Sequence, residues 1–527
     1  MDLGAYRVQA ETFVAELGDE YHAHYAGLRD GFEVDAIYAR HAALFAPAAV
    51  DALRVLTAAA DDAAGVRDDE ARRLRMLLDF AVEGCVGLAT APAAEAIAQR
   101  EASLRLDVGG TMLGFRESST VQANEPSRER RAEIEAVRLE ATETQLNPLH
   151  REALARTRDV VRELGWSSYR ALCSELKGYD LEALSDGTAQ FLAATDAAYA
   201  GVVEPALARV VGVGLGDFAR ADLPWFFRAR VDDDAFPAER PLEAYGATLA
   251  GLGLEPTAGG RIALDVEARP RKSPRAFCVP VRAPQDVRLV VAPVGGRDDY
   301  VALLHEGGHA QHYAHVEPAL PFEFRQLGDN AVTEAFAFLF DHLTEDPRWL
   351  RRRLGVGSGG RGAAAGAGAA GSGSRGAVAS TAAERDDDPL AVHARAARLV
   401  YLRRYCGKLA YESVAHGEAP PDDAALADVY SRSLSSAVGV AWPSATYLAD
   451  LDPGFYVAAY LRAWALETHL RRWLEQRFGP DWFATPAAGE LLRGLWADGQ
   501  RLSAEELLHT LTGEQLDLAV LVADLGL

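Results

Sequence analysis

A helical pattern of apolar residues runs along most of this chain and constrains its fold more than any other feature. Apolar side chains recur three and four positions apart over residues 8–60, 67–105, 128–165 and 181–213. A different pattern follows, in which prolines separate short Val-rich runs at 261–266, 276–281 and 287–292. Helical patterning then returns until the end of the sequence. We therefore predict a mainly α fold with one small β-sheet.

Composition and charge exclude several classes of protein. The 527 residues are 49% hydrophobic and 25% charged, which is typical of globular rather than disordered chains. A net charge of −23 argues against nucleic acid as a partner, and the four scattered cysteines argue against a disulfide framework. There is no apolar leader segment and no apolar run of about 18 residues. We therefore expect a cytoplasmic protein without a membrane partner, and no feature specifies its oligomeric state.

The most informative motif is HEGGH at residues 305–309, inside a helical stretch. Positions i and i+4 share one face of a helix, so the imidazoles of His305 and His309 can bind one metal ion. Glu306 lies one residue on and can act as a general base toward water at that ion. Asp298 or Asp299 is expected to cap this helix. The two mid-helix glycines cost about 1 kcal/mol each relative to alanine, so we expect a close neighbour to compensate.

A catalytic zinc site has three protein ligands and an open position, so a third ligand is needed. His315 has the spacing of HExxHxxGxxH enzymes, but the required glycine is missing and every methionine lies upstream. Asp329 fits better as a helix N-cap, and Glu323 has no clear helical context. Glu334 lies in an apolar helical segment, where a lone carboxylate is costly unless paired or bound to metal. The predicted ligands of one Zn²⁺ per chain are His305, His309 and Glu334.

These residues resemble the thimet oligopeptidase and oligoendopeptidase F family of zinc metallopeptidases. The family motif is close to HEFGH, from which this chain departs only at Gly307. A glutamate at the spacing of Glu334 and an aspartate at the position of Asp299 also match that family. Residues 309–335 equally resemble relatives of angiotensin-converting enzyme, although their glutamate comes one residue sooner. The specific resemblance covers about residues 270–345 and 440–480.

A second match is the sequence FYVAAY at residues 455–460, which reproduces the FYVxxY of oligoendopeptidase F-like proteins. In that family such tyrosines help to bind the oxyanion, which implies this role for Tyr456 and Tyr460. The family has a histidine shortly before these tyrosines, whereas this chain has Asp450 and its neighbours there. Asp452 is expected to N-cap the helix that carries both tyrosines.

The resemblance implies a two-lobed helical ellipsoid with a deep central channel for short peptide substrates and a small sheet near the zinc site. We predict one peptidase unit over residues 1–527. Its residues 1–258 are expected to form one channel wall, and 259–527 the catalytic half. The parts of that half are the sheet at 259–296, zinc helices at 298–345, a mobile Gly-rich insertion at 355–384 and C-terminal helices at 388–527.

The predicted activity is that of a metalloendopeptidase, an oligopeptidase in which Glu306 takes a proton from the attacking water. Two alternatives stay open. A Taq-type metallocarboxypeptidase would release single C-terminal residues, although its additional motifs do not appear. A non-catalytic relative would only bind peptides, which the departure near Asp450 favours and the retained Glu306 opposes. Cleavage specificity, peptide length and the physiological substrate are not specified by these motifs.

Overall fold

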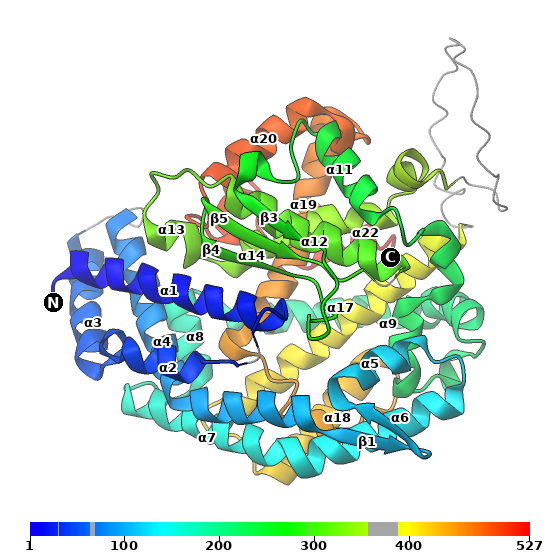
Figure 1. Ribbon diagram of the computed structural model, residues 1–527, viewed down its shortest axis with the longest axis horizontal. Helices are drawn as coiled ribbons and strands as arrows, with labels where there is room; N and C mark the ends of the chain where they lie inside the picture. The colour runs from blue at the N-terminus through cyan, green and yellow to red at the C-terminus, as the bar shows by residue number, and fades with distance from the viewer. Residues whose placement is uncertain (30, 64–68, 294, 357–387) are drawn as a thin grey trace.

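The computed structural model describes residues 1–527 except 30, 64–68, 294 and 357–387. The Gly-rich insertion predicted at 355–384 therefore lies almost wholly outside the described residues. Helices dominate the rest, with two small sheets beside them, and this confirms the mainly α class (Figure 1). The division into two lobes around a deep channel stays a prediction.

The helices and strands are named in chain order. The N-terminal helices are α1 (Leu3–Tyr25), α2 (Val34–Arg40), α3 (Pro47–Ala63) and α4 (Asp69–Ser103). They are followed by β1 (Arg105–Val108), β2 (Thr111–Gly114), α5 (Phe115–Asn124), α6 (Arg128–Ala141), α7 (Asn147–Glu163), α8 (Tyr169–Lys177), α9 (Leu181–Val210), α10 (Leu223–Arg228) and α11 (Pro241–Gly251). The second half holds β3 (Ile262–Asp265), β4 (Phe277–Arg282), β5 (Asp286–Val290), α12 (Arg297–Ala314), α13 (Phe322–Gln326), α14 (Asn330–Asp341) and α15 (Pro347–Trp349). The last helices are α17 (Pro389–Ala415), α18 (Asp423–Val438), α19 (Tyr456–Phe478), α20 (Pro486–Ala497), α21 (Ala504–Thr512) and α22 (Ala519–Asp524).

The three Val-rich runs form the three-stranded sheet. Its strand order is β3-β5-β4, with β3 parallel and β4 antiparallel to β5. Val287 and Leu289 of β5 are fully buried, because the central strand packs beneath α12. The sheet therefore supports the helix that carries the HEGGH motif, as Figure 1 shows in the upper part of the molecule.

A second, two-stranded sheet was not predicted. Strands β1 and β2 form a hairpin in which Val108 pairs with Thr111, so the turn is Gly109-Gly110. Both glycines have positive φ angles, of 56° and 82°, as two-residue hairpin turns require. The dipeptide Gly-Gly between two short apolar runs was the signal for this hairpin.

Among the described residues, two large hydrophobic cores hold most of the helices together, and a smaller one joins the β1–β2 hairpin to α5 and α6. The first joins N-terminal helices to α9, α17 and α18, and α17 packs along α9. The second surrounds α14, which lies between α12 and α19 and contributes the buried Phe336 and Leu339. Because α14 contacts both neighbours closely, it brings the HEGGH helix and the tyrosine helix to one place.

One charged run is partly buried. Such a run on a helix usually indicates a solvated face, and residues 128–131 are such a run, but Arg131 is 1% exposed. Its guanidinium donates to Asp222 at 2.8 Å, and this carboxylate is also buried. The pattern could not show this, because the partner lies 91 residues further along the chain.

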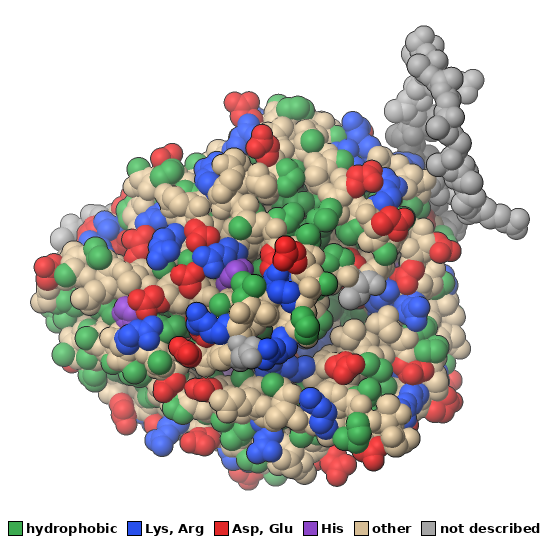
Figure 2. Space-filling view, viewed as in Figure 1, with side chains coloured by type: hydrophobic (Ala, Val, Ile, Leu, Met, Phe, Trp, Pro, Cys, Tyr) green, Lys and Arg blue, Asp and Glu red, His purple; other side chains and the backbone are tan. Residues whose placement is uncertain are grey.

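The apolar character of helix α4 and the distribution of surface charge are two further features of the molecule. Helix α4 is long and apolar enough to cross a membrane, a criterion that core helices also meet. Half of its 18-residue apolar stretch is buried inside the protein. In the structure α4 packs against α3 and α7. Acidic and basic side chains are interspersed over the face shown in Figure 2.

Candidate metal centre

Helix α12 carries the HEGGH motif, and its start differs from the prediction. Neither Asp298 nor Asp299 caps it, because the helix already begins at Arg297 after Gly296. Asp299 instead accepts a hydrogen bond from the backbone N–H of Gly295 at 2.5 Å. Its carboxylate thus orders the loop that leads into the helix.

The two glycines of the motif allow close packing, as their cost suggested. A Cβ atom at Gly308 would lie 2.7 Å from the Cα atom of Ala337 on α14 and 2.9 Å from the carbonyl oxygen of Phe336. At Gly307 it would lie 2.4 Å from the ring of Tyr245. The backbone of α14 therefore approaches α12 at the turn between the two histidines.

Replacing Gly308 with alanine is expected to lower the thermal unfolding midpoint. Alanine favours the helix by about 1 kcal/mol, but overpacking against rigid backbone typically costs about 1–3 kcal/mol. Gly494 of α20 is a matched control, since a Cβ atom there meets nothing within 4 Å. Gly494→Ala should raise the midpoint or leave it unchanged, and an equal rise for Gly308→Ala would contradict the packing argument.

His305, His309 and Glu334 come together as predicted and form a group that can hold a metal ion. The Nε2 atoms of His305 and His309 lie 3.4 and 3.5 Å from Oε2 of Glu334. Two ligands about 2.1 Å from a tetrahedral ion lie about 3.4 Å apart, so this spacing fits one ion. Oε2 of Glu334 is buried without a hydrogen-bond partner, which is costly unless a cation binds it.

Each histidine is oriented by a second residue. Nδ1 of His305 lies 2.9 Å from Oδ2 of Asp341, and Nδ1 of His309 lies 2.8 Å from Oγ1 of Thr333. These contacts occupy Nδ1 of both rings and leave Nε2 directed at Glu334. The sequence alone singles out neither Asp341 nor Thr333 for this role. Their position on α14 was the available signal. Thr333 lies one residue before Glu334 and Asp341 seven residues after it, that is, about two helical turns further on.

Charge at this group favours binding of a cation. Burial alone would raise the pKa of Glu334, but His309 and His305 outweigh it and hold that pKa well below its usual range. Burial alone would lower the pKa of His305, but Asp341 and Glu334 raise it well above its usual range. A metal ion would displace the proton that His305 then holds, because only unprotonated imidazole binds metal.

Removing the support of His305 is expected to weaken metal binding without abolishing it. Asp341→Asn should raise the Kd for zinc about 10–100-fold, the usual effect of losing an orienting carboxylate. Competition with a chromogenic chelator measures this constant. Asp428→Asn on α18 is the control, since that carboxylate is 60% exposed and pairs with Arg432, which lies four residues further along the same helix. Equal affinities for both variants would mean that Asp341 has no orienting role.

Glu306 lies beside the metal group without belonging to it. Burial raises the pKa of its carboxyl, although the charges of His309 and His305 and the backbone of Cys278 on β4 act in the opposite direction. A raised carboxyl pKa brings a general base closer to neutral pH, where it takes up a proton more readily.

Tyr456 and Tyr460 both lie on α19 near the group, but their hydroxyls differ. Tyr456 donates to Oε1 of Glu334 at 2.6 Å. The hydroxyl of Tyr460 has no hydrogen-bond partner in the part of the chain that the structure describes. The hydroxyl of Tyr456 is therefore engaged with Glu334, whereas the hydroxyl of Tyr460 remains available to donate a hydrogen bond.

The helix of the tyrosines begins later than predicted. Asp452 precedes only the short 3₁₀ turn at Pro453–Phe455, and its carboxylate binds Lys408 at 2.7 Å instead of capping. Gly454 and Phe455 have positive φ angles of 63° and 52°, so the chain bends sharply before α19. Left-handed backbone at a buried phenylalanine is strained, and such strain tends to occur at functional sites.

Aromatic rings continue outward from the two tyrosines. Ring centroids of Tyr460 and Trp464 are 5.9 Å apart, and Tyr405 of α17 lies 5.5 Å from Tyr460. Tyr401 stacks on Tyr405 at 5.4 Å and is 40% exposed. This row provides apolar contact area directly beside the metal group.

The other sequence candidates lie outside the metal group. Asp329 caps α14 through the N–H of Ala331, as predicted, and also binds Arg462 at 2.6 Å. Glu323 is fully buried and pairs with Arg7 of α1 at 2.6 Å. Nδ1 of His315 lies 2.8 Å from a carbonyl oxygen within α12. Asp450, where the resembled family has a histidine, binds Arg404 and Tyr430.

Comparison with known proteins supports the fold. A solved structure named BsuCP superposes on this chain. The TM-score is 0.60 at 12% sequence identity, and the alignment covers 99% of this chain and 97% of that one. At this identity the likeness shows a shared fold alone. No protein-family model and no curated protein matches the sequence.

Proposed function

We propose that this protein is a zinc-dependent oligopeptidase that cleaves short peptides. The observation that carries the proposal is the convergence of three ligand atoms, Nε2 of His305, Nε2 of His309 and Oε2 of Glu334, at a spacing that fits one metal ion beside Glu306. Two histidines and a glutamate form a common ligand set of hydrolytic zinc, which leaves one position open. Zinc would supply a Lewis acid and lower the pKa of water to about 7.

The chain's own residues supply the remaining chemistry. Glu306 accepts a proton from the attacking water and then passes it to the leaving amine. Tyr456 fixes Glu334 through its hydrogen bond, so it orients a ligand. Tyr460 has the open hydroxyl and is the better candidate to donate to the developing oxyanion, where one donor typically contributes about 10²–10³ in rate. This assignment refines the role that the two tyrosines shared in the sequence prediction.

Product analysis on a defined peptide tests the proposal. The protein is incubated with a ten-residue peptide blocked at both ends, with and without a zinc chelator, and fragments are identified by mass spectrometry. We expect internal cuts that the chelator abolishes and added zinc restores. The same peptide with a free C-terminus is tested in parallel, and release of single C-terminal residues from it, without cuts in the blocked peptide, would favour the carboxypeptidase alternative. Zinc binding without any cleavage would favour a non-catalytic peptide-binding protein.

A further inference from the structure

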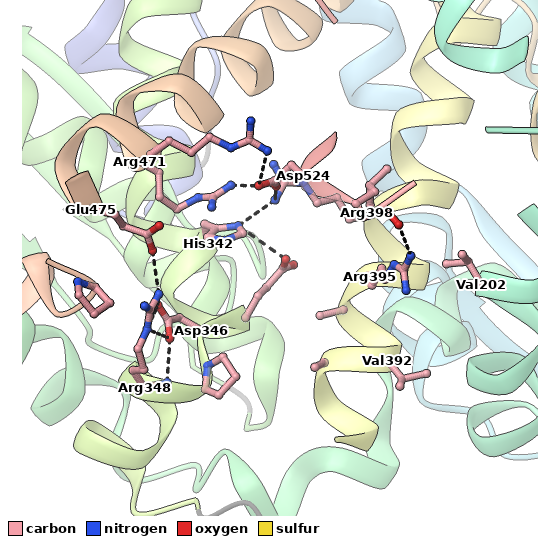
Figure 3. Close-up of a pocket in the computed structure, with 18 of the residues that line it drawn as sticks. Val202, His342, Asp346, Arg348, Val392, Arg395, Arg398, Arg471, Glu475 and Asp524 are labelled. Carbon is pink, nitrogen blue, oxygen red and sulfur yellow. Dashed lines mark hydrogen bonds and ion pairs between the residues drawn. The ribbon is translucent and has the colours of Figure 1, made fainter. Parts of the chain in front are cut away.

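A large cavity lies apart from the metal group. Its volume is about 1380 Å³, and its walls come from α9, α17, the end of α19, the segment after α14 and the last residues of the chain. Figure 3 shows Arg395 of α17 on the opposite side of this space from Arg348, while Arg398 of α17 reaches His342. Typical small-molecule sites occupy about 300–1,000 Å³, so the cavity admits a ligand together with water.

The lining of this cavity is rich in arginine. The arginines are Arg348, Arg351, Arg352, Arg395, Arg398, Arg471 and Arg472. The acidic lining residues are Glu345, Asp346, Glu475, Asp481 and Asp524. Seven cations thus face five anions, in a chain whose net charge is −23. The described lining is therefore locally positive.

The acidic groups are already engaged. Asp524 accepts from Arg398 at 3.0 Å and from Arg471 at 2.8 Å, and Arg472 lies 3.6 Å away (Figure 3). Asp346 and Glu475 both bind Arg348, each at 2.7 Å. These ion pairs hold the guanidinium groups in place, and the single carboxylate of Asp524 lies near those of Arg398, Arg471 and Arg472.

Two arginines have donors to spare. Among the described residues, neither Arg351 nor Arg395 has an acidic partner. Arg395 donates one bond, to the carbonyl oxygen of Gly526 at 3.3 Å, and its buried Nε atom has no acceptor. A buried guanidinium nitrogen without an acceptor is costly, and the terminal nitrogens of the same guanidinium make that single bond, so they can also donate to an anion in the cavity.

The histidine in the wall responds to this positive charge. Burial lowers the pKa of His342 well below its usual range, and Arg471, Arg398 and Arg348 lower it further. Neutral His342 presents Nδ1 to Arg398 at 3.0 Å. Arg398 and Arg471 also pair with the buried Glu467, at 3.2 and 2.7 Å, so the arginines left for a ligand are the ones without an acidic partner.

We propose that this cavity binds a small polyanion through its phosphate groups. Guanidinium groups match phosphate oxygens in a bidentate fashion, and preset arginines lose little freedom on binding. The described lining holds no Phe, Tyr or Trp, so no ring stacks on a nucleobase. The ligand is therefore a free oligophosphate or a phosphorylated sugar, which share this chemistry. The proposal does not depend on the hydrolytic function.

Calorimetric titration of the full-length protein tests the site, with pyrophosphate and a sugar bisphosphate as probes at constant ionic strength. We expect saturable binding of one anion per chain. Arg395→Gln and Arg351→Gln should each weaken it about tenfold, the usual loss for a hydrogen bond to a charged group. Tighter binding of the bisphosphate identifies a phosphorylated metabolite, and tighter binding of pyrophosphate identifies free oligophosphate.

Matched variants make the result decisive. Arg432→Gln on α18 removes an arginine that is 69% exposed and does not belong to the described lining, so it should leave the affinity unchanged. Circular dichroism establishes whether each variant is folded. If Arg395→Gln does not fold, the result for Arg351→Gln decides, because Arg351 is exposed and its replacement should not disturb the fold. Absence of saturable binding, or equal weakening by Arg432→Gln, overturns the proposal. So does binding that Glu334→Gln abolishes and Arg395→Gln spares, because the anion would then bind at the metal.

Discussion

Replacing Glu306 with glutamine is expected to lower kcat for peptide hydrolysis by about 10²–10⁴-fold while zinc content stays unchanged. The side chain stands next to His305 in sequence but contributes no atom to the group of ligands. Glutamine keeps its size and removes its ability to accept a proton. Burial raises the pKa of the native carboxyl, which makes it an effective base, so its loss should affect kcat more than KM.

The control for this variant is Glu317→Gln. Glu317 follows α12 on the exposed surface, and its backbone N–H binds the carbonyl of Ala497, so the fold does not depend on its carboxylate. Steady-state kinetics with a quenched fluorescent peptide and metal analysis by mass spectrometry are measured for both variants. Wild-type kcat in Glu306→Gln would remove this residue from the mechanism, and loss of zinc would make it a ligand instead.

Local signals explain which parts of the site could be predicted. The pair His305 and His309 follows from helical spacing alone, and Glu334 follows from the cost of a carboxylate among apolar neighbours. The three strands could be placed because short Val-rich runs between prolines have few alternatives. Each of these inferences needs only residues within one or two turns or one strand.

Contacts between distant segments explain what could not be predicted. The bond from Tyr456 to Glu334 joins residues 122 positions apart, so no spacing shows that this hydroxyl is engaged and that of Tyr460 is open. Helix α19 begins late because Lys408 binds Asp452 and the backbone bends at Gly454. The burial of Arg131 likewise depends on a remote carboxylate.

Replacing Glu334 with glutamine should weaken zinc binding more than the loss of an orienting residue does, thus by more than about 10–100-fold. Glutamine is isosteric and its amide oxygen can still accept from Tyr456, so the packing of α14 is kept. It removes the buried negative charge that faces His305 and His309. The stabilisation that excess zinc gives the folded protein, seen as a rise in the unfolding midpoint, should shrink accordingly.

Glu323→Gln separates this effect from the general cost of removing a buried carboxylate. Glu323 is also fully buried, but its partners are Arg7 and Arg73, at 2.6 and 3.3 Å, and none of them belongs to the metal group. This variant should unfold at a lower temperature, because two arginines lose their shared partner, yet bind zinc with wild-type affinity. If Glu323→Gln loses zinc and Glu334→Gln keeps it, Glu323 is the third ligand. If both keep it, two histidines suffice and the predicted site is wrong.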